Sequence, residues 1–409
     1  MKKIAFATLG CKLNQYETQG MIEQVENFYE VSNFMQPNDV YVINSCAVTA
    51  KAAKESRHLV KKALSLNKNA RVIYTGCDSY LEEDFGKNVV VLGNIYKQNL
   101  HKALRLSKND IADYTKTYTI DYALKGYYKK SRAFVKIQEG CNNHCTYCII
   151  PKLRGRERDK DEFLIIEELT RLSLAGFSEI VLTGTNIGSY RNIKKLLIKI
   201  NASNIKSRIR ISSIEPMYID EEFLDIISDG NFAKHLHIPL QSGDDKILRL
   251  MGRDYTVSEY EKIVNLCDKK GIFTGTDIIV GFFQEDDESF KKTKNFIENI
   301  PLVYGHIFSY SKRPHTAAVN IKSNLERGPK VRNRNTILKN LFDRKFRLKM
   351  QGIVGSRVEF VTESTVIEKN NQKFYKAISS QYFPVLVKEH KKGIVAKTVK
   401  SFDGEYAYT

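Results

Sequence analysis

The sequence predicts an α/β protein in three parts: an N-terminal parallel α/β sheet, a central open (β/α)6 partial barrel, and a small C-terminal antiparallel β-barrel. Apolar runs alternate with helical segments in two successive series, a polar basic connector separates these series, and the last part changes to short alternating runs. A length of 409 residues with 42% hydrophobic residues is enough for two or three globular cores. We place the parts at residues 1–125, 126–352 and 353–409.

The first part contains four apolar runs that are typical of buried parallel strands. The runs are KIAFATL, DVYVINS, RVIYTG and NVVVLG, and helices are expected over residues 14–29 and 50–66. Cys11, Cys46 and Cys77 each follow one of these strands. Ligands of open α/β sheets bind beyond the carboxyl ends of the strands, so we expect the three thiols to meet along one edge.

The second series follows the connector KGYYKKSR at residues 125–132. Its six expected strands are AFVKIQ, EIVLTG, RIRISSI, HLHIPLQ, GTDIIVGF and VYGHIFSY, and its helices include residues 163–175 and 258–270. Six such units indicate an open, incomplete β/α barrel, in which the chemistry lies at the C-terminal ends of the strands. Cys141 follows the first of these strands.

The end of the chain is strongly basic and then changes character. Residues 321–350 carry ten Lys or Arg against two Asp or Glu, which fits either a solvated helix face or a phosphate-binding helix. The runs SRVEFVTES, KFYKAISS, FPVLVKE and GIVAKTVKSF then predict a small antiparallel barrel of the kind that binds nucleic acid. The net charge of +18 also indicates a polyanionic partner.

The sequence gives no sign of a membrane segment or an export signal. No apolar run approaches the ~20 residues of a membrane-spanning helix, and the apolar stretch before Cys11 is too short for a lipoprotein signal. We therefore expect a cytoplasmic protein. Its seven cysteines are an odd number and are expected to be reduced thiols or metal ligands, with Cys267 as a core residue.

Cys141, Cys145 and Cys148 form a C-x3-C-x2-C motif that lacks a fourth cysteine. This spacing differs from the bacterial ferredoxin pattern. A zinc site could use His144 as the fourth ligand, although His144 is adjacent to Cys145 and both rarely reach one tetrahedral ion. The remaining interpretation is a 4Fe-4S cluster in which one iron has no protein ligand.

The motif, with Tyr147 just before its last cysteine and a βα series after it, resembles that of the radical S-adenosylmethionine (SAM) superfamily. The resemblance implies that SAM binds the open iron. The reduced cluster would then donate one electron to the sulfonium of SAM, which gives methionine and a 5′-deoxyadenosyl radical. Such a radical removes hydrogen from an unactivated C–H bond.

The whole chain resembles the radical SAM methylthiotransferases, which replace C–H by C–S–CH3. TLGCKLNQYET, NSCAVTAKAAKESR and TGC resemble the N-terminal cluster domain of this family, and GCNNHCTYCIIPKLRGRER resembles its radical core. GCKLNQYET, SSIEP and HLHIPLQSGDDKILRLMGRDYT are similar to the MtaB branch, which modifies N6-threonylcarbamoyladenosine-37 of tRNA. The other branches modify N6-isopentenyladenosine-37 of tRNA or an aspartate of a ribosomal protein.

The resemblance also implies roles for individual residues. Cys11, Cys46 and Cys77 would hold an auxiliary 4Fe-4S cluster, and Cys141, Cys145 and Cys148 would hold the catalytic SAM-binding cluster. Residues expected to lie where the superfamily holds SAM, with backbone or packing roles as alternatives, are Tyr147, Gly184, Asn186, Glu215, Gln241 and Ser242. Arg154 and Arg156 would orient SAM or bind substrate phosphate, with surface pairing as the alternative.

Two loops depart from the family pattern. The usual GFPGE is GFFQE at residues 281–285, and the usual YSxRxGTxAA is YSKRPHTAA at residues 310–318. By analogy both lie near the barrel mouth, so these differences affect the expected fit of the substrate and not the binding of the clusters.

Together these features predict a tRNA methylthiotransferase that uses two SAM, one as the methyl donor and one as the radical source. The expected partners are the tRNA anticodon stem-loop, bound with help from a C-terminal module that resembles the TRAM domain, and an electron donor such as flavodoxin or ferredoxin. DNA and membranes are not expected partners. A rival of another class is a non-catalytic RNA-binding protein with a structural zinc site.

Overall fold

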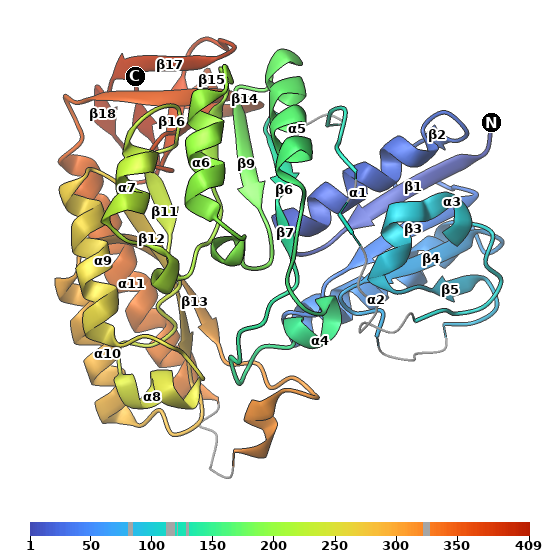
Figure 1. Ribbon diagram of the computed structural model, residues 1–409, viewed down its shortest axis with the longest axis horizontal. Coiled ribbons are helices and arrows are strands. Elements are labelled where there is room, and N and C mark those ends of the chain that lie inside the picture. The colour runs from blue at the N-terminus through green and yellow to red at the C-terminus, as the bar shows by residue number, and fades with distance from the viewer. Residues whose placement is uncertain (81–84, 112–118, 121, 128–130, 322–327) are drawn as a thin grey trace.

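The computed structural model describes residues 1–80, 85–111, 119–120, 122–127, 131–321 and 328–409 (Figure 1). Its fold class is the predicted one. Part of the connector at 125–132 and part of the basic segment at 321–350 lie outside the described residues. Within the described ranges, no helix has both the length and the hydropathy needed to cross a membrane.

The N-terminal sheet has five strands, four of which the sequence predicts. The strands are β1 (Lys3–Thr8), β2 (Glu30–Val31), β3 (Val40–Ser45), β4 (Arg71–Gly76) and β5 (Val89–Val91). They lie in the order β2-β1-β3-β4-β5, and every neighbouring pair is parallel. The edge strand β2 has two residues and neither is buried, so no apolar run marks it.

Helices cover both faces of this sheet (Figure 1). They are α1 (Lys12–Val25), α2 (Ala50–Leu66), the 3-10 helix η1 (Asn94–Asn99) and α3 (Leu100–Ala103). Val42 of β3 packs with α1 and α3 on one face, and Tyr41 packs with α2 on the other. All six residues of β3 are therefore buried, which accounts for the apolar run that predicts it.

The six predicted strands of the second series form the barrel wall. They are β6 (Ala133–Lys136), β9 (Glu179–Thr183), β10 (Arg208–Ile211), β11 (His235–His237), β12 (Phe273–Val280) and β13 (Leu302–Ser309). Parallel pairing gives two sheets, β10-β9-β6 and β11-β12-β13, which isolated bridges between Ile209 and Phe232 and between Ser213 and His237 connect. Among the described strands β6 and β13 do not pair, so the barrel is open as predicted.

Helices surround the outside of the barrel. They are α5 (Glu162–Leu174), α6 (Ile193–Ala202), α7 (Glu221–Ser228), α9 (Val257–Lys269), α10 (Asp287–Asn299) and α11 (Pro329–Gln351). α5 and α9 each begin one residue before the predicted helix. α9 begins there because Thr256 and Glu259 form a capping box, in which each side chain accepts a hydrogen bond from the backbone N–H of the other.

Short elements connect the strands of the barrel. They are β7 (Gln138–Glu139), α4 (Ile150–Arg154), β8 (Arg158–Asp159), η2 (Ile187–Ser189), η3 (Pro216–Tyr218), α8 (Asp245–Leu250) and η4 (Ala317–Asn320). β7 and β8 form an antiparallel pair. The cysteine motif and α4 lie between these two strands, so the pair closes the base of that segment.

Helix α1 connects the N-terminal part to the barrel (Figure 1). Tyr16 of α1 packs with Phe134 of β6 and Val181 of β9. Its hydroxyl donates a hydrogen bond to Glu168 of α5 at 3.3 Å. Lys12, the first residue of α1, lines a cavity together with residues of the barrel strands. The N-terminal end of α1 therefore faces the barrel interior.

The C-terminal part is a curled sheet, a half-barrel in place of a closed one. Its strands are β14 (Arg357–Lys369), β15 (Gln372–Ser379), β16 (Pro384–Val387), β17 (Ile394–Thr398), β18 (Ser401–Phe402) and β19 (Ala407–Tyr408), in the order β17-β14-β15-β16-β19-β18. All neighbouring pairs are antiparallel except β16 with β19. The predicted antiparallel module is thus confirmed, with two additional short strands at one edge.

A buried ion cluster joins this sheet to the barrel. Glu179 of β9 accepts hydrogen bonds from Arg208 at 2.7 Å and from Arg210 at 2.8 Å. The two guanidinium groups also donate to carbonyl groups of the C-terminal sheet, among them those of Ile378 and Ser379. Burial would raise the pKa of Glu179, but Arg210 and Arg208 lower it to about 2. The sheet is thereby fixed at the N-terminal end of the barrel strands.

Candidate functional site

The cysteine loop of the barrel is held in place by backbone contacts. Cys141 donates its N–H to the carbonyl of Gly155 at 3.1 Å, and Thr146 bonds to carbonyl groups at the end of α8. Gly140 has a φ of 79°, and a Cβ at this position would lie 2.0 Å from the carbonyl oxygen of Arg156. Only glycine fits there, and the path of the chain into the loop is fixed.

The three thiols of this loop are all partly buried. Burial raises the pKa of Cys148 to about 12, and the charges of Cys145 and Cys141 raise it as well. Burial also raises the pKa of Cys141 to about 11. The thiols are protonated near neutral pH in the metal-free chain, so iron binding at this loop must displace protons.

Arg253, which the sequence analysis does not identify, is the main charged neighbour of this loop. Its guanidinium lies 3.2 Å from Sγ of Cys145 and 3.4 Å from the hydroxyl of Tyr147, and it forms an ion pair with Glu215. Burial raises the pKa of Cys145, whereas Arg253 lowers it. Arg253 lies in the MGRDYT segment, far from the motif in sequence, so no local pattern indicates this contact.

Three of the six residues predicted to hold SAM gather around the cysteine loop. Glu215 contacts Arg253, while Tyr147 and Gln241 line one cavity of about 240 Å³. Gln241 has a φ of 68°, and its backbone bonds on both sides to β12. This left-handed conformation turns the chain at the end of β11, where the side chain meets the cavity.

The other three predicted residues have different surroundings. Asn186 is buried and donates to Glu157 and Tyr218, and its Oδ1 has no partner among the described residues. At Gly184 a Cβ would lie 2.8 Å from the carbonyl oxygen of Gln138, so the position requires glycine. Ser242 is buried against Thr293 of α10, with the two hydroxyl oxygens 3.4 Å apart. These contacts are compatible with the packing alternative for Gly184 and Ser242, and their place at the SAM site stays a prediction.

The N-terminal cysteines come together at the carboxyl edge of the parallel sheet. Cys11 precedes α1, Cys46 follows β3 and Cys77 follows β4. A Cβ on Gly10 would lie 2.8 Å from Sγ of Cys46, so the segment of Cys11 passes directly over Cys46. Burial raises the pKa of Cys46 to about 11, and the charges of Cys77 and Cys11 act in the same direction. The three thiols are therefore neighbours in space.

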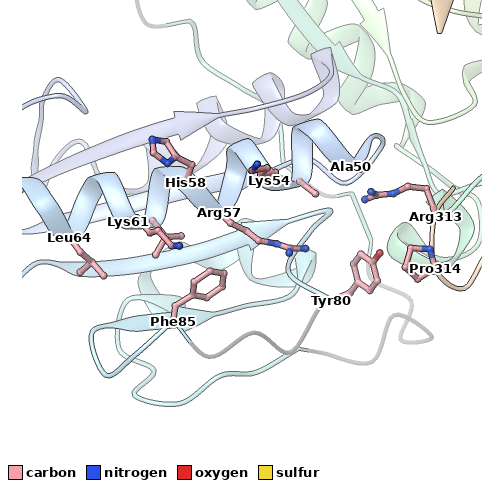
Figure 2. Close-up of a pocket in the computed structure, with 12 residues that line it drawn as sticks. Ala50, Lys54, Arg57, His58, Lys61, Leu64, Tyr80, Phe85, Arg313 and Pro314 are labelled. Atoms are coloured by element: carbon pink, nitrogen blue, oxygen red, sulfur yellow. The ribbon is translucent and has the colours of Figure 1, made fainter. Parts of the chain in front are cut away.

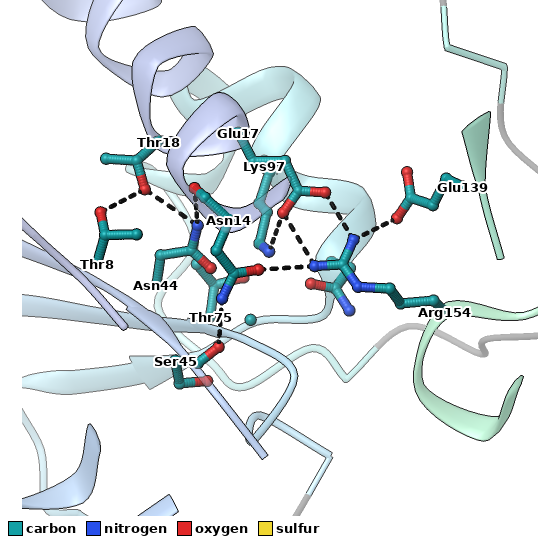
Figure 3. Close-up of polar contacts among 12 residues, drawn as sticks. Thr8, Asn14, Glu17, Thr18, Asn44, Ser45, Thr75, Lys97, Glu139 and Arg154 are labelled. Atoms are coloured by element: carbon teal, nitrogen blue, oxygen red, sulfur yellow. Dashed lines mark hydrogen bonds and ion pairs between the residues drawn. The ribbon is translucent and has the colours of Figure 1, made fainter. Parts of the chain in front are cut away.

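A buried polar network joins α1 of the N-terminal part to α4 of the barrel (Figure 3). Arg154 of α4 forms ion pairs with Glu17 at 2.7 Å and with Glu139 at 2.8 Å, and it donates to Asn14 at 2.7 Å. Lys97 also pairs with Glu17 at 2.7 Å. Burial would raise the pKa of Glu17, but Arg154 and Lys97 hold it well below its usual value. The network fixes α1 against α4.

The positive charges of this network act on Cys77. Burial raises the pKa of Cys77, whereas Arg154 and Lys97 lower it. Both cations are themselves buried, at 4% exposure each. Arg154 is thus placed within the protein and beside the N-terminal cysteines, while Arg156, the other arginine predicted to bind substrate, is exposed on the following loop.

Helix α4 connects the two cysteine sites. It starts just after Cys148 and ends at Arg154, and Ile149 and Leu153 pack with Cys77 and Ala47. At a rise of 1.5 Å per residue, the five residues of α4 span about 7.5 Å along the helix axis. One short helix therefore leads from the barrel cysteine loop to the surroundings of the N-terminal thiols.

A cavity of about 240 Å³ lies between the two cysteine segments. Its wall includes Val48 and Thr49, which follow Cys46, and Tyr147 of the barrel loop. Asp277 of β12 lines both this cavity and a second one of about 180 Å³ inside the barrel. Arg313, from the YSKRPHTAA segment, also lines this cavity. Residues of the N-terminal part and residues of the barrel thus line the same cavity.

A larger groove of about 780 Å³ runs along α2 (Figure 2). Lys54, Arg57, His58 and Lys61 follow one another at helical spacing on its α2 side. Tyr80 and Phe85 lie across from the helix, and Arg313 and Pro314 lie at one end. Because Arg313 lines both the groove and the 240 Å³ cavity, the two are adjacent. We refer to this feature as the basic groove.

The spacing of the thiols bears on the alternative of a single zinc ion. Four ligands at about 2.3 Å from a tetrahedral ion lie about 3.8 Å from one another. Within the described part of the chain, the only group of three such side chains with all ligand atoms within 4.8 Å of one another is His237, Asp277 and His306. The members of each cysteine trio are thus spaced more widely than one ion requires.

Two family descriptions match the chain. Residues 135–297 match the radical SAM superfamily. Residues 3–93 match a family described as uncharacterized protein family UPF0004. The first match covers the barrel cysteine loop, and the second covers the three N-terminal cysteines.

Characterised relatives match most of the chain. It is 38% identical to threonylcarbamoyladenosine tRNA methylthiotransferase MtaB of Aquifex aeolicus, over 84% of this chain and 88% of that protein. It is 36% identical to the MtaB of Bacillus subtilis, over 81% and 78%. It is 32% identical to the tRNA-2-methylthio-N(6)-dimethylallyladenosine synthase of Thermodesulfovibrio yellowstonii, over 83% of each.

Solved structures with a similar fold include the radical S-adenosylmethionine methyltransferase TsrM of Kitasatospora setae. Its structure with cobalamin and a [4Fe-4S] cluster matches with a TM-score of 0.57 and 14% identity, over 81% of this chain and 82% of that chain. The structure with tryptophan and a SAM analogue also gives a TM-score of 0.57. At this identity the similarity concerns the fold.

Proposed function

The chain belongs to the radical SAM methylthiotransferases, and on this premise we propose that it converts N6-threonylcarbamoyladenosine-37 of tRNA to the 2-methylthio derivative. The observation that carries the proposal is that α4, which follows the barrel cysteine loop, packs on Cys77, and that residues close in sequence to Cys46 and Cys148 line one cavity. Replacing C–H by C–S–CH3 needs a hydrogen-abstracting site and a sulfur-delivering site within reach of one carbon, and this arrangement offers both.

The enzyme uses SAM and iron-sulfur chemistry, and we propose two 4Fe-4S clusters. When bound, the clusters and SAM would supply one-electron reduction, sulfur and the methyl group. Cys141, Cys145 and Cys148 would hold the SAM-binding cluster, and Cys11, Cys46 and Cys77 the auxiliary one. Three thiols in each set leave one iron of each cluster without a protein ligand.

The residues around the barrel cysteine loop are suited to holding an amino acid such as the methionine part of SAM. Glu215 and the free Oδ1 of Asn186 offer acceptors for an ammonium group, and Arg253 offers donors for a carboxylate. Tyr147 and Gln241 form the wall of the adjacent cavity, where they exclude water from the reacting carbon.

At the auxiliary site, we propose that Arg154 and Lys97 stabilise the negative charge of cysteine thiolates. Both cations are buried and both favour the ionised form of Cys77. Arg154 then acts as a positioning residue between the domains. Arg156, which is exposed, stays a candidate for contact with tRNA phosphate.

We propose that tRNA approaches along the basic groove, with the target adenine in the 240 Å³ cavity. The groove contributes Lys54, His58 and Lys61 on one helix face, and phosphate contacts of this kind supply much of the affinity for RNA. The C-terminal half-barrel would bind another part of the anticodon stem-loop. Some cations of the basic helix α11 are already paired with acidic side chains: Lys330 pairs with Asp287, and Arg344 pairs with Glu298.

We propose that flavodoxin or ferredoxin supplies electrons, that the reaction takes place in the cytoplasm where tRNA is modified, and that residues 1–125, 126–352 and 353–409 act as the auxiliary-cluster, radical SAM and RNA-binding domains. The +18 net charge supports an anionic partner.

The test is mass spectrometry of nucleosides from bulk tRNA of a strain that lacks this protein and of the same strain complemented with it. Loss of 2-methylthio-N6-threonylcarbamoyladenosine on deletion, with accumulation of its unthiolated precursor, is the expected result. If this nucleoside is unchanged while the methylthio form of isopentenyladenosine or of the ribosomal aspartate disappears, the assigned substrate is wrong and the reaction class stands.

A further inference from the structure

The second cavity, inside the barrel, is small and polar. Its volume is about 180 Å³, and it shares Asp277 with the cavity proposed for the target adenine. Among the residues that line it are Lys12, Arg210, His237, Asp277, Tyr304 and His306. Val181 and Ile211 are the only aliphatic side chains in this lining. The cavity is thus suited to a polar group that is attached to something in the adjacent space.

Lys12 is the one residue of this lining that comes from the N-terminal part of the chain. It forms no hydrogen bond or ion pair with any residue that the structure describes, and it is partly buried. Its charge also acts on His306 in the same lining: burial and the charges of His237 and Lys12 lower the pKa of His306, whereas Asp277 raises it. Lys12 is therefore a cation that has no counterion among the described residues and that faces a polar cavity.

Arg210, the other cation of the lining, is already engaged. Its guanidinium pairs with Glu179 at 2.8 Å and donates to the carbonyls of Ser379 and Ser380 at 2.9 and 3.1 Å. It also lies over the ring of Tyr382. An anion that enters the cavity would thus find its free donor in Lys12.

The position of Lys12 relative to the auxiliary cysteines follows from the backbone. Cys11 and Lys12 are consecutive, at the start of α1. In adenine, C2 and C6 flank N1 on one edge of the ring, so the substituent on N6 lies beside the carbon that receives sulfur. A side chain next to a cluster ligand is therefore well placed to bind the N6 substituent while C2 faces the cluster.

The threonylcarbamoyl group matches this cavity in chemistry. It carries a carboxylate, a hydroxyl and a urea linkage, all of which need hydrogen-bond partners once they are buried. Lys12 offers a charge for the carboxylate, and His237, Asp277 and Tyr304 offer polar atoms for the rest. A dimethylallyl group would leave these polar atoms unpaired, which costs free energy.

A divalent metal ion is the competing occupant, because the ligand atoms of His237, Asp277 and His306 lie within 4.8 Å of one another. The Asp277 carboxylate is, however, bonded to His237 at 3.0 Å, and the Lys12 charge next to His306 disfavours a further cation. The free ammonium group makes an anion the better match.

We propose that Lys12 binds the carboxylate of the threonylcarbamoyl group and so selects this nucleoside over adenosines with an uncharged N6 substituent. This inference rests on the proposed function. Lys12 acts here as a specificity-determining residue, and the 180 Å³ cavity is the binding site for the substituent.

The experiment measures the affinity of the iron-loaded enzyme for two anticodon stem-loop RNAs of identical sequence. One carries threonylcarbamoyladenosine and the other its carboxamide, in which the carboxylate is replaced by a neutral amide. A charged hydrogen bond in a partly buried site predicts that the wild-type enzyme binds the carboxylate RNA about tenfold more tightly. In Lys12→Gln this ratio should fall to about one, and Lys12→Arg should restore part of it.

The matched control is Lys87→Gln, which removes one charge from an exposed lysine of the same part of the chain and should keep the wild-type ratio. Equal affinity of the wild-type enzyme for the two RNAs overturns the inference without any substitution, even if Lys12→Gln impairs folding or iron content. An undiminished ratio in Lys12→Gln also overturns it.

Measuring turnover of the two RNAs distinguishes a failure of this inference from a failure of the proposed function. If the wild-type enzyme does not methylthiolate the threonylcarbamoyl RNA, the proposed function fails. If it methylthiolates the carboxylate and carboxamide RNAs with equal kcat/KM, the function stands and the role of Lys12 is wrong. A lower KM for the carboxylate RNA, lost in Lys12→Gln with kcat retained, supports the role.

Discussion

The two cysteine sites are built in different ways. Cys141, Cys145 and Cys148 lie on one loop whose backbone is fixed by local contacts. Cys11, Cys46 and Cys77 come from three strand ends, and their surroundings are completed by α4 of the barrel. The barrel loop depends on one main charged neighbour, Arg253, whereas a network of buried ion pairs lies behind the N-terminal thiols.

The barrel site is thus contained in one short sequence motif, whereas the N-terminal site is assembled from segments that are distant in sequence. A short loop carries its ligand spacing in the sequence, so it is recognisable without the fold. The N-terminal site exists only when the sheet has formed and α4 has docked on it. Damage to the domain interface should therefore affect the N-terminal site far more than the barrel loop.

The largest expected contrast comes from single cysteine substitutions. Cys141→Ala removes a proposed ligand of the SAM-binding cluster, and no SAM cleavage above background is expected in an anaerobic assay. Cys46→Ala should still cleave SAM but transfer no methylthio group to RNA, because it affects only the auxiliary site. Persistent cleavage in Cys141→Ala, or loss of cleavage in Cys46→Ala with the barrel cluster intact, would contradict the division of roles. Cys267→Ala, at a buried core cysteine, is the control.

Arg154→Ala tests the interface on which the assembled site depends. The substitution removes one buried cation from Glu17 and Glu139, which keep Lys97 and Lys136 as partners, and it should lower the free energy of unfolding by about 1–3 kcal/mol. Iron bound at the N-terminal cysteines should also decrease, as measured by metal analysis of a variant that lacks the barrel cysteines. Arg156→Ala, at an exposed arginine two residues away, should change stability by less than about 0.5 kcal/mol. Similar effects of Arg154→Ala and Arg156→Ala on stability and iron content would contradict a special role of the domain interface.

Arg253→Lys tests the barrel loop. Lysine keeps the positive charge but cannot contact Cys145, Tyr147 and Glu215 together, as the planar guanidinium does. Loss of one charged hydrogen bond predicts that SAM cleavage falls about tenfold, mainly through a higher KM for SAM. Iron at the N-terminal site should be unchanged. Arg249→Lys, on the exposed face of α8, should leave the KM for SAM at its wild-type value.

The smallest expected effect is that of the basic groove, which lies outside both cysteine sites. The double substitution Lys54→Gln and Lys61→Gln should weaken tRNA binding and reduce the slope of log affinity against log salt by about one to two units. Fluorescence anisotropy over a salt series measures this slope. Lys102→Gln with Lys108→Gln, two exposed lysines elsewhere in the N-terminal part, should not change it. If the salt slope is unchanged in the Lys54→Gln, Lys61→Gln variant, the RNA does not bind in the basic groove.

Much of the fold could be predicted because each element carries its own pattern. The helix expected at residues 50–66 is α2, with identical limits, because Thr49 provides a cap at its start. The helix expected at 14–29 ends early, at Val25, since the chain turns there toward the edge strand β2. Strands of two residues, such as β18 and β19, depend on their neighbours and leave no period in the sequence.

The sequence predicts only those site residues that belong to a short local pattern. The cysteines are visible from spacing and strand ends, but Lys12, Lys97 and Arg253 have no pattern of their own. They matter because the fold brings them to a thiol or a cavity from a distant segment. Arg154 is singled out in the sequence, but its burial between two domains depends on long-range packing that no short motif records.

Helix α4 has a consequence for the biosynthesis of the protein. Leu153 and Arg154 complete the surroundings of Cys77, yet the ribosome produces them only after all three cysteines of the barrel loop. The nascent N-terminal part can form its sheet early, but its proposed auxiliary-cluster site stays unfinished until α4 has emerged and docked. Iron insertion at the first trio should therefore follow synthesis of the second. A fragment that ends at residue 125 should hold iron weakly, however well its sheet folds.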